Sequence, residues 1–394
     1  MSDASPAAPI GDDTALAIRG LVKIYGNLIA VADLSLDIPT GSFYGIVGPN
    51  GAGKTTTLTM ATGLLTPDKG TAYVHGVDVW GDTQRARGLL GVMPDGMRLL
   101  DRLSGPDFLV HVGMLHGLDA SVARERAHEL LAALDLAEAG KKLISDYSAG
   151  MTKKIALAAA LIHSPRVLVL DEPFEAVDPV SATNIRQILT DYTKRGGTVI
   201  LSSHVMATVQ QLCTHVAIID KGRVLVAGTT DEVAQGVALA QSVHNDGITH
   251  LHAHFASLPG RMAWMASKIT GIPYTLTTHA KDIFHKSVDS TWLRRICRDA
   301  DRVIAISQFN KTYLDEALAG TGATISLRYN ALELDRFSYR APEQVSAKRA
   351  EPLRVCAVGR LVPKKGFADL VEAVRILVSS GVDVEAELAG DGDE

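Results

Sequence analysis

The stretch GPNGAGKTTT, residues 48 to 57, carries glycines, a lysine and threonines at a spacing that suits a phosphate group. From Gly48 to Thr55 it matches G-x-x-x-x-G-K-[ST], between an apolar stretch and a helix-forming one. In such a loop the backbone N–H groups face phosphate oxygens, Lys54 reaches the β and γ phosphates, and the Thr55 hydroxyl binds Mg²⁺. The predicted phosphate-binding residues are Gly48, Pro49, Asn50, Gly51, Ala52, Gly53, Lys54, Thr55 and Thr56. A chance glycine turn is the alternative.

Acidic residues follow a second apolar stretch, VLVLDEP, at residues 167 to 173. A buried parallel strand ending in Asp171 and Glu172 would place both at the carboxyl edge of a sheet. Asp171 is predicted to organise Mg²⁺ and Glu172 to act as general base on the attacking water. His204 ends another apolar stretch, TVILSSH, and could contact the γ-phosphate. A solvated carboxylate pair and a structural histidine are the alternatives.

These motifs, in this order, resemble the ATP-binding subunits of ABC transporters over residues 16 to 236. By this resemblance Tyr25 stacks on adenine, YSAGMTKK (147 to 154) is the signature segment with Ser148 and Gly150 retained, and Asp178 belongs to the D-loop. Asp95 replaces the family's glutamine at a position that senses Mg²⁺, so it is expected at the metal. Residues 96 to 146, with apolar residues at helical spacing, are the expected helical subdomain.

The resemblance also implies how the chain works. With one P-loop, ATP is expected to join two copies head to tail, each signature serine completing the other copy's γ-phosphate shell. The longest apolar run, IALAAALI, is shorter than the roughly 20 residues that span a bilayer, so the implied partner is a separate transmembrane permease, most plausibly of an exporter. The chain is expected in the cytoplasm, on the inner face of the cell membrane.

The second half begins a new alternation of strands and helices after residue 236. The strings HLHAHF, IPYTLTTHAKDIF, ADRVIAIS, NALELDRF and VGRLVPKKGF resemble GT-B glycosyltransferases, which use nucleotide-sugar donors. By this resemblance His279 lies against the donor sugar, and Arg360 and Lys365 neutralise its diphosphate. The expected domains are a disordered tail (1–15), the ABC cassette (16–236), a partial GT-B N-terminal domain (237–343) and the start of the C-terminal one (344–394).

The stretch AQSVHNDGITHLHAHF, residues 240 to 255, is interpreted as the seam between these halves. Three of its histidines, at 250, 252 and 254, alternate on one strand face, which allows a zinc site as the alternative. By this resemblance, the transferase-like half is expected to lack the opening strands of that fold and to be cut short at AGDGDE. We therefore expect this half to be poorly stable and its transferase activity to be lost.

The net charge and the cysteine positions limit which other partners and folds are expected. The net charge of −5 gives no general attraction to nucleic acid, and Cys213, Cys297 and Cys356 are too far apart for a disulfide framework. The predicted fold class is α/β: a P-loop NTPase cassette with a helical subdomain, then an incomplete Rossmann-like region. The favoured function is an ABC-type ATPase, because its site is complete. A working glycosyltransferase completed by a partner chain, and a non-transport ABC protein acting as a regulator or on nucleic acid, are the alternatives.

Overall fold

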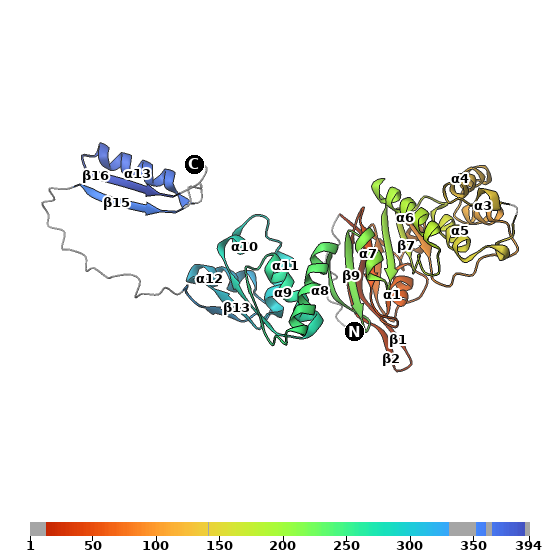
Figure 1. Ribbon diagram of the computed structural model, residues 1–394, viewed down its shortest axis with the longest axis horizontal. Coiled ribbons are helices and arrows are strands. Elements are labelled where there is room, and N and C mark those ends of the chain that lie inside the picture. The colour runs from red at the N-terminus through yellow and green to blue at the C-terminus, as the bar shows by residue number, and fades with distance from the viewer. Residues whose placement is uncertain (1–12, 141, 331–351, 360–364, 391–394) are drawn as a thin grey trace. The chain divides into compact units, whose positions relative to one another are not determined.

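The computed structural model describes residues 13–140, 142–330, 352–359 and 365–390 (Figure 1). They fall into two compact units, one within residues 1–330 and one within residues 331–394. Among the described residues, no helix combines the length and the apolar character needed to cross a bilayer.

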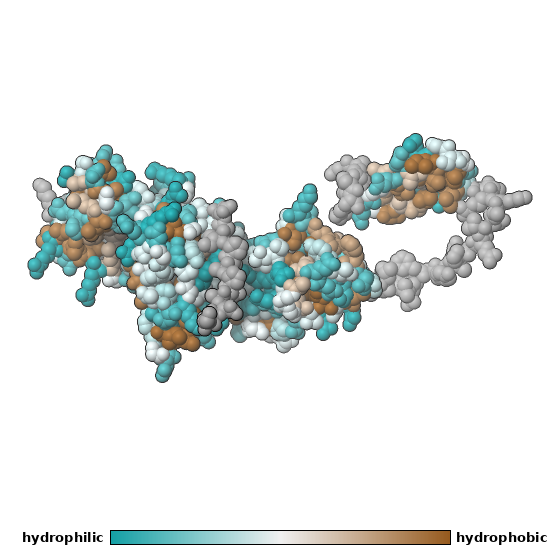
Figure 2. Space-filling view, turned by 180° about the vertical axis from the view of Figure 1, so that it is seen from behind, coloured by the Kyte–Doolittle hydropathy of each residue, from teal (hydrophilic) through white to brown (hydrophobic). Residues whose placement is uncertain are grey.

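The first sheet is antiparallel, and its order is β2-β1-β4-β5. Its strands are β1 (Thr14–Tyr25), β2 (Leu28–Pro39), β4 (Lys69–Val74) and β5 (Val77–Asp78). The hairpin of β1 and β2 turns at Gly26 and Asn27, because Tyr25 pairs with Leu28 and Gly26 has a positive φ of 58°. β1 begins at Thr14, so residues 14 and 15 belong to this strand and not to the predicted tail. Figure 2 shows apolar surface at the hairpin, where Leu28 is 66% exposed.

The second sheet has the order β10-β9-β3-β8-β7-β6, parallel except for β10. Its strands are β3 (Phe43–Val47), β6 (Leu90–Met93), β7 (Val167–Leu170), β8 (Thr198–Ser203), β9 (His215–Asp220) and β10 (Arg223–Thr229). Side chains of β3 and β8 alternate between two hydrophobic clusters, one on each face. This double burial explains why the sequence shows continuous apolar runs here, as predicted for residues 167 to 173.

Helices surround the second sheet, and the predicted helical subdomain is present. Within it, α3 and α4 pack together and against α5 through Leu109, Leu131 and Ile155, which are all buried. The helices of this part are α1 (Lys54–Ala61), α2 (Thr83–Leu89), α3 (Gly105–Leu115), α4 (Ala120–Ala133), α5 (Ala149–Leu161), α6 (Pro179–Lys194), α7 (Met206–Leu212) and α8 (Thr230–Asn245), with short 3₁₀ turns at Ala137–Ala139 and Ile144–Asp146.

The third sheet is parallel, β11-β12-β13-β14, as the βα alternation predicts. Its elements are β11 (Leu251–His254), α9 (Leu258–Thr270), β12 (Tyr274–Thr278), α10 (Ala280–Phe284), α11 (Ser290–Asp299), β13 (Arg302–Ala305), α12 (Gln308–Ala317) and β14 (Ile325–Leu327). Helix α8 runs through the predicted boundary at residue 236 and packs against α9 (Figure 1). The second and third sheets contribute to one continuous hydrophobic cluster.

The unit within residues 331–394 contains one βαβ arrangement. Strand β15 (Leu353–Val358) pairs in parallel with β16 (Val384–Ala389), and α13 (Phe367–Ser379) connects them. Apolar side chains of α13 remain on the surface, with Val371 55% and Val378 54% exposed, and Figure 2 shows this face in brown.

Candidate nucleotide site

The glycine-rich loop connects β3 to α1, the context that the sequence predicts. A side chain at Gly48 would place its Cβ 2.2 Å from the Ile219 carbonyl oxygen. Gly53, the N-cap of α1, has a φ of 99°, and a Cβ there would lie 2.5 Å from the Ala30 carbonyl oxygen. Both positions therefore require glycine, which lets the loop turn tightly before the helix.

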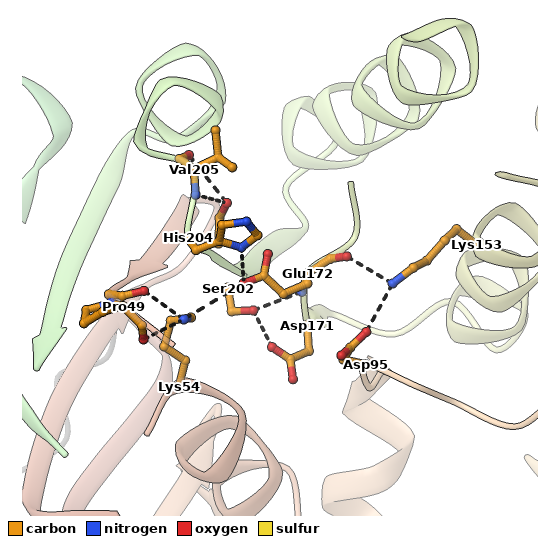
Figure 3. A network of polar contacts seen from close by, with 11 residues as sticks. Pro49, Lys54, Asp95, Lys153, Asp171, Glu172, Ser202, His204 and Val205 are labelled. Carbon is orange, nitrogen blue, oxygen red and sulfur yellow. Dashed lines mark hydrogen bonds and ion pairs between the residues drawn. The ribbon is translucent and has the colours of Figure 1, made fainter. Parts of the chain in front are cut away.

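Lys54, the first residue of α1, is held inside this loop (Figure 3). Its ammonium donates hydrogen bonds to the carbonyl oxygens of Gly48, at 2.8 Å, and Pro49, at 3.2 Å, and lies 4.0 Å from Glu172 Oε1. The side chain is only 7% exposed. The Lys54 ammonium is largely shielded from water and lies within a loop of backbone amides, an arrangement that favours binding of a polyphosphate.

The two acidic residues that follow β7 are held by a serine of the next strand. Ser202 Oγ, at the end of β8, donates to Asp171 Oδ1 and accepts from the Glu172 backbone N–H at 3.0 Å. Glu172 Oε1 lies 3.1 Å from His204 Nδ1. The carboxylate, the imidazole and the ammonium of Lys54 therefore converge at one edge of the sheet, as Figure 3 shows.

The site also fits a divalent cation. Asp171 is 3% exposed, yet its Oδ2 atom is buried without a hydrogen-bond partner. A buried carboxylate oxygen without a donor is costly, and Mg²⁺ or a water bound to it would supply the missing interaction. Thr55, at the start of α1, adds the kind of oxygen that this ion prefers.

The residues predicted for the signature segment and the D-loop meet at the N-termini of two helices. Ser148 caps α5 by accepting the Met151 N–H at 3.3 Å, and Asp178 caps α6 by accepting the Ser181 N–H at 2.9 Å. A Cβ at Gly150 would lie 2.8 Å from Asp178 Oδ2, so glycine permits this approach. The pKa of Asp178 is held below its usual value by hydrogen bonds from Ser181. The bond from the Ser181 backbone N–H has the largest effect.

Two predicted residues lie at the margins of this arrangement. Tyr25 ends β1 with 49% of its surface exposed, and Lys23 Nζ lies 5.8 Å from the centre of its ring. Asp95, in the loop after β6, pairs with Lys153 of α5 at 3.5 Å. Lys153 also donates to the Glu172 carbonyl oxygen at 3.1 Å.

Sequence reasoning did not single out Ser202 or Lys153. Ser202 is fully buried at the end of an apolar strand, and a polar residue in that position was the only signal. Lys153 lies within the segment YSAGMTKK, and no pattern in the sequence indicates which residues it contacts.

The sugar-donor residues predicted in the second half are only partly within the described residues. His279 caps α10, and its Nε2 lies 3.3 Å from His254 Nδ1 of β11. Arg360 lies outside the described residues, and Lys365 is exposed in the other compact unit. His250 and His252 both lie within hydrogen-bond distance of Thr275. Among the residues that the structure describes, no three histidine, cysteine, aspartate or glutamate side chains are grouped so as to hold a metal ion.

Comparison with known proteins finds two family models along the chain. The ABC transporter model matches residues 31–175, and the Glycosyltransferase Family 4 model matches residues 220–336. Both predicted resemblances are thereby confirmed. The second match begins at the end of β9, before the predicted boundary at residue 236.

Relatives and solved structures point to the first of these families. The daunorubicin/doxorubicin resistance ATP-binding protein DrrA of Streptomyces peucetius is 33% identical over 302 residues, which are 76% of this chain and 86% of the relative. The Nod factor export ATP-binding protein I of Ralstonia nicotianae is 33% identical over 285 residues, 70% of this chain and 85% of that protein. A solved ATP-binding subunit of an ABC transporter has a TM-score of 0.54 at 26% identity, covering 57% of this chain and 94% of that one. The chain, with its glycine-rich loop and paired acidic residues, belongs to the family of ABC transporter ATP-binding proteins.

Proposed function

We propose that this chain binds MgATP at the loop of residues 48–55 and hydrolyses it, and that it powers export through a separate membrane protein. The observation that carries the proposal is the convergence of Lys54, Glu172 and His204 beside a buried, unpartnered oxygen of Asp171. Export is supported by relatives whose names concern drug resistance and Nod factor export.

Each side chain has a role in this proposal. The backbone N–H groups of Gly48 and residues 50–53, together with Lys54 and Thr56, bind the phosphates, while Tyr25 covers the adenine. Thr55 and Asp171 hold Mg²⁺, which when bound draws negative charge from the phosphate oxygens. Glu172 accepts a proton from the attacking water, and His204 donates a hydrogen bond to the γ-phosphate.

A second copy of the chain is the proposed partner across the nucleotide. Ser148 and Asp178 are exposed, and Val180, beside Asp178 on α6, is 78% exposed, so the N-termini of α5 and α6 form an accessible surface. Because a helix N-terminus attracts anions, the N-terminus of α5 can complete the γ-phosphate shell of the opposite copy.

The helical subdomain is the proposed contact to the permease, at the inner face of the cell membrane. Met114 and Leu115, at the end of α3, are 51% and 74% exposed, and Leu100 precedes this helix with 48% exposed. Large apolar side chains that remain exposed favour a protein partner.

The test of hydrolysis is Glu172→Gln, compared with Glu175→Gln, which changes an exposed glutamate three residues later. We expect Glu172→Gln to reduce turnover at least about 100-fold, because general-base catalysis contributes that much, and to retain ATP while accumulating as a dimer. Glu175→Gln should behave as wild type. Turnover that survives in Glu172→Gln, or loss of ATP binding in it, would contradict the assigned role.

Sugar transfer is a second candidate, favoured by the match over residues 220–336 and by the pairing of His254 with His279. It is tested by incubating the chain with UDP-, GDP- and ADP-sugars and measuring nucleotide release. Release that disappears in His279→Ala, with ATP hydrolysis unchanged, would support it. Equal release from both forms would argue against it.

A further inference from the structure

Lys153 contacts both the side chain of Asp95 and the backbone of Glu172 (Figure 3). Its ammonium lies 3.5 Å from Asp95 Oδ1 and donates to the carbonyl oxygen of Glu172 at 3.1 Å. The three residues come from different elements: α5, the loop after β6 and the turn after β7. One side chain thus joins the helix that carries Ser148 to the backbone of the proposed general base.

The backbone of Glu172 needs such support. Its φ is 46°, in the left-handed region that side chains other than glycine adopt at a cost. Ser202 accepts its N–H, and Lys153 donates to its carbonyl oxygen, so the residue is held on both sides. A shift of α5 would move Lys153 and, through it, the Glu172 backbone.

Asp95 supplies the charge that holds Lys153 in place. The Lys153 side chain is only 20% exposed and its ammonium has a carboxylate beside it, so the contact is charge-assisted. Asp95 itself is 47% exposed, so water screens the pair and its effect is modest.

We propose that Lys153 is a positioning residue: it transmits the position of α5 to Glu172 and depends on Asp95 to do so. The inference rests on the proposed ATPase function and deepens it. It gives Asp95 a partner within the chain, in place of the metal-binding role that the family pattern suggests for this position.

The test is a double-mutant cycle of Lys153→Met and Asp95→Asn, with steady-state ATP hydrolysis as the measurement. We expect each single variant to lower kcat about two- to five-fold, the range of a partly exposed ion pair, with little change in KM for ATP. The double variant should be no slower than the slower single variant, since both break the same contact. Lys153→Arg, which keeps the charge, should hydrolyse ATP nearly as wild type does.

Lys194→Met is the matched control, because Lys194 forms an exposed ion pair with Asp191 on α6, away from this network. It should leave kcat unchanged. Additive effects in the cycle, or an unchanged Lys153→Met, would overturn the inference. So would a higher Mg²⁺ requirement in Asp95→Asn alone, which would make Asp95 a metal ligand. A wild-type chain that binds ATP without hydrolysing it would overturn both this inference and the proposed function.

Discussion

Ser202 forms hydrogen bonds to both acidic residues of the site. It donates to Asp171 and accepts from the Glu172 backbone, and it is completely buried. Each of those groups would lose its partner if the hydroxyl were removed. The geometry of the proposed metal ligand and of the proposed base therefore depends on one oxygen atom.

Ser202→Ala is expected to destabilise the chain by about 1–3 kcal/mol, because it leaves buried polar groups unsatisfied. It should also raise the Mg²⁺ concentration needed for half-maximal ATP hydrolysis. Urea unfolding and a Mg²⁺ titration measure the two effects. Ser203→Ala is the control, since that hydroxyl only closes a local turn with Val205. If both variants had the same stability and Mg²⁺ requirement, Ser202 would have no special role.

At this scale the sequence predicted residues that belong to a spaced motif, such as Gly48, Lys54 and Thr55, because the loop is local and its context is visible. It did not predict contacts between distant segments. Ser202 reaches back 31 residues to Asp171, and Lys153 reaches across 58 positions to Asp95. Such contacts depend on strand order and helix packing, which spacing does not reveal.

At the scale of elements, α3 and α5 meet through two stacked histidines. The rings of His116, the C-cap of α3, and His163, just after α5, lie 3.7 Å apart and nearly parallel. His163 Nε2 lies 3.0 Å from the Leu90 carbonyl oxygen, so this nitrogen carries the proton. Burial is the main cause that lowers the pKa of His163 to about 4, and the nearby charges of His116 and Arg126 lower it further.

The stability of the helical subdomain should therefore depend on pH. Since the pKa is 6.5 for an ordinary histidine and about 4 here, the unfolded chain binds the proton more readily between these values. Stability is fully present above pH 6.5 and should fall as the pH is lowered towards 4, by about 2 kcal/mol because solvent reaches part of the ring and reduces the full effect.

Urea unfolding at several pH values checks this expectation in the wild type, in His163→Gln and in His111→Gln. The His163 variant should show a flatter pH dependence, because it removes the titrating group but keeps an N–H donor. His111 is exposed on the same α3 and serves as control. An unchanged slope in His163→Gln would contradict the assignment.

The elements themselves were largely predictable. Apolar runs marked the buried strands, and the βα alternation marked the third sheet, because both patterns are set by which faces are buried. The helix across the predicted boundary is the exception. Its capping box, Thr229 with Glu232, is readable in the sequence, but a capping box marks where a helix begins and does not show how far it continues.

At the scale of the molecule, α8 belongs to both parts of the chain, because it continues past residue 236 and packs against α9. Gly236 of α8 faces Met265 of α9 so closely that a Cβ would lie 2.7 Å from the Met265 Cβ. Glu232 and Arg261 form an ion pair across the same helices at 2.9 Å. The match to Streptomyces DrrA spans 76% of the chain, more than the 236 residues before the predicted boundary, so similarity continues past it.

This packing changes what we expect of the whole chain. From the sequence, the region after residue 236 should be lost rapidly to proteases while the cassette resists. The interface of α8 with α9, and a hydrophobic cluster shared by both parts, favour joint protection up to about residue 330. Limited proteolysis with masses read out distinguishes the two outcomes, and early cleavage between residues 237 and 330 would support the expectation from sequence.

Gly236→Val tests whether the interface stabilises both parts. A valine would force α8 and α9 apart, and overpacking of this kind costs about 1–3 kcal/mol. Ala238→Val introduces the same side chain at an exposed position of the same helix, where it costs some helix propensity but causes no clash. We expect calorimetry to show one transition for residues up to 330 in the wild type, lowered in Gly236→Val and nearly unchanged in Ala238→Val. Two separate transitions in the wild type, or equal effects of the two variants, would mean that the cassette folds independently of the third sheet and its helices.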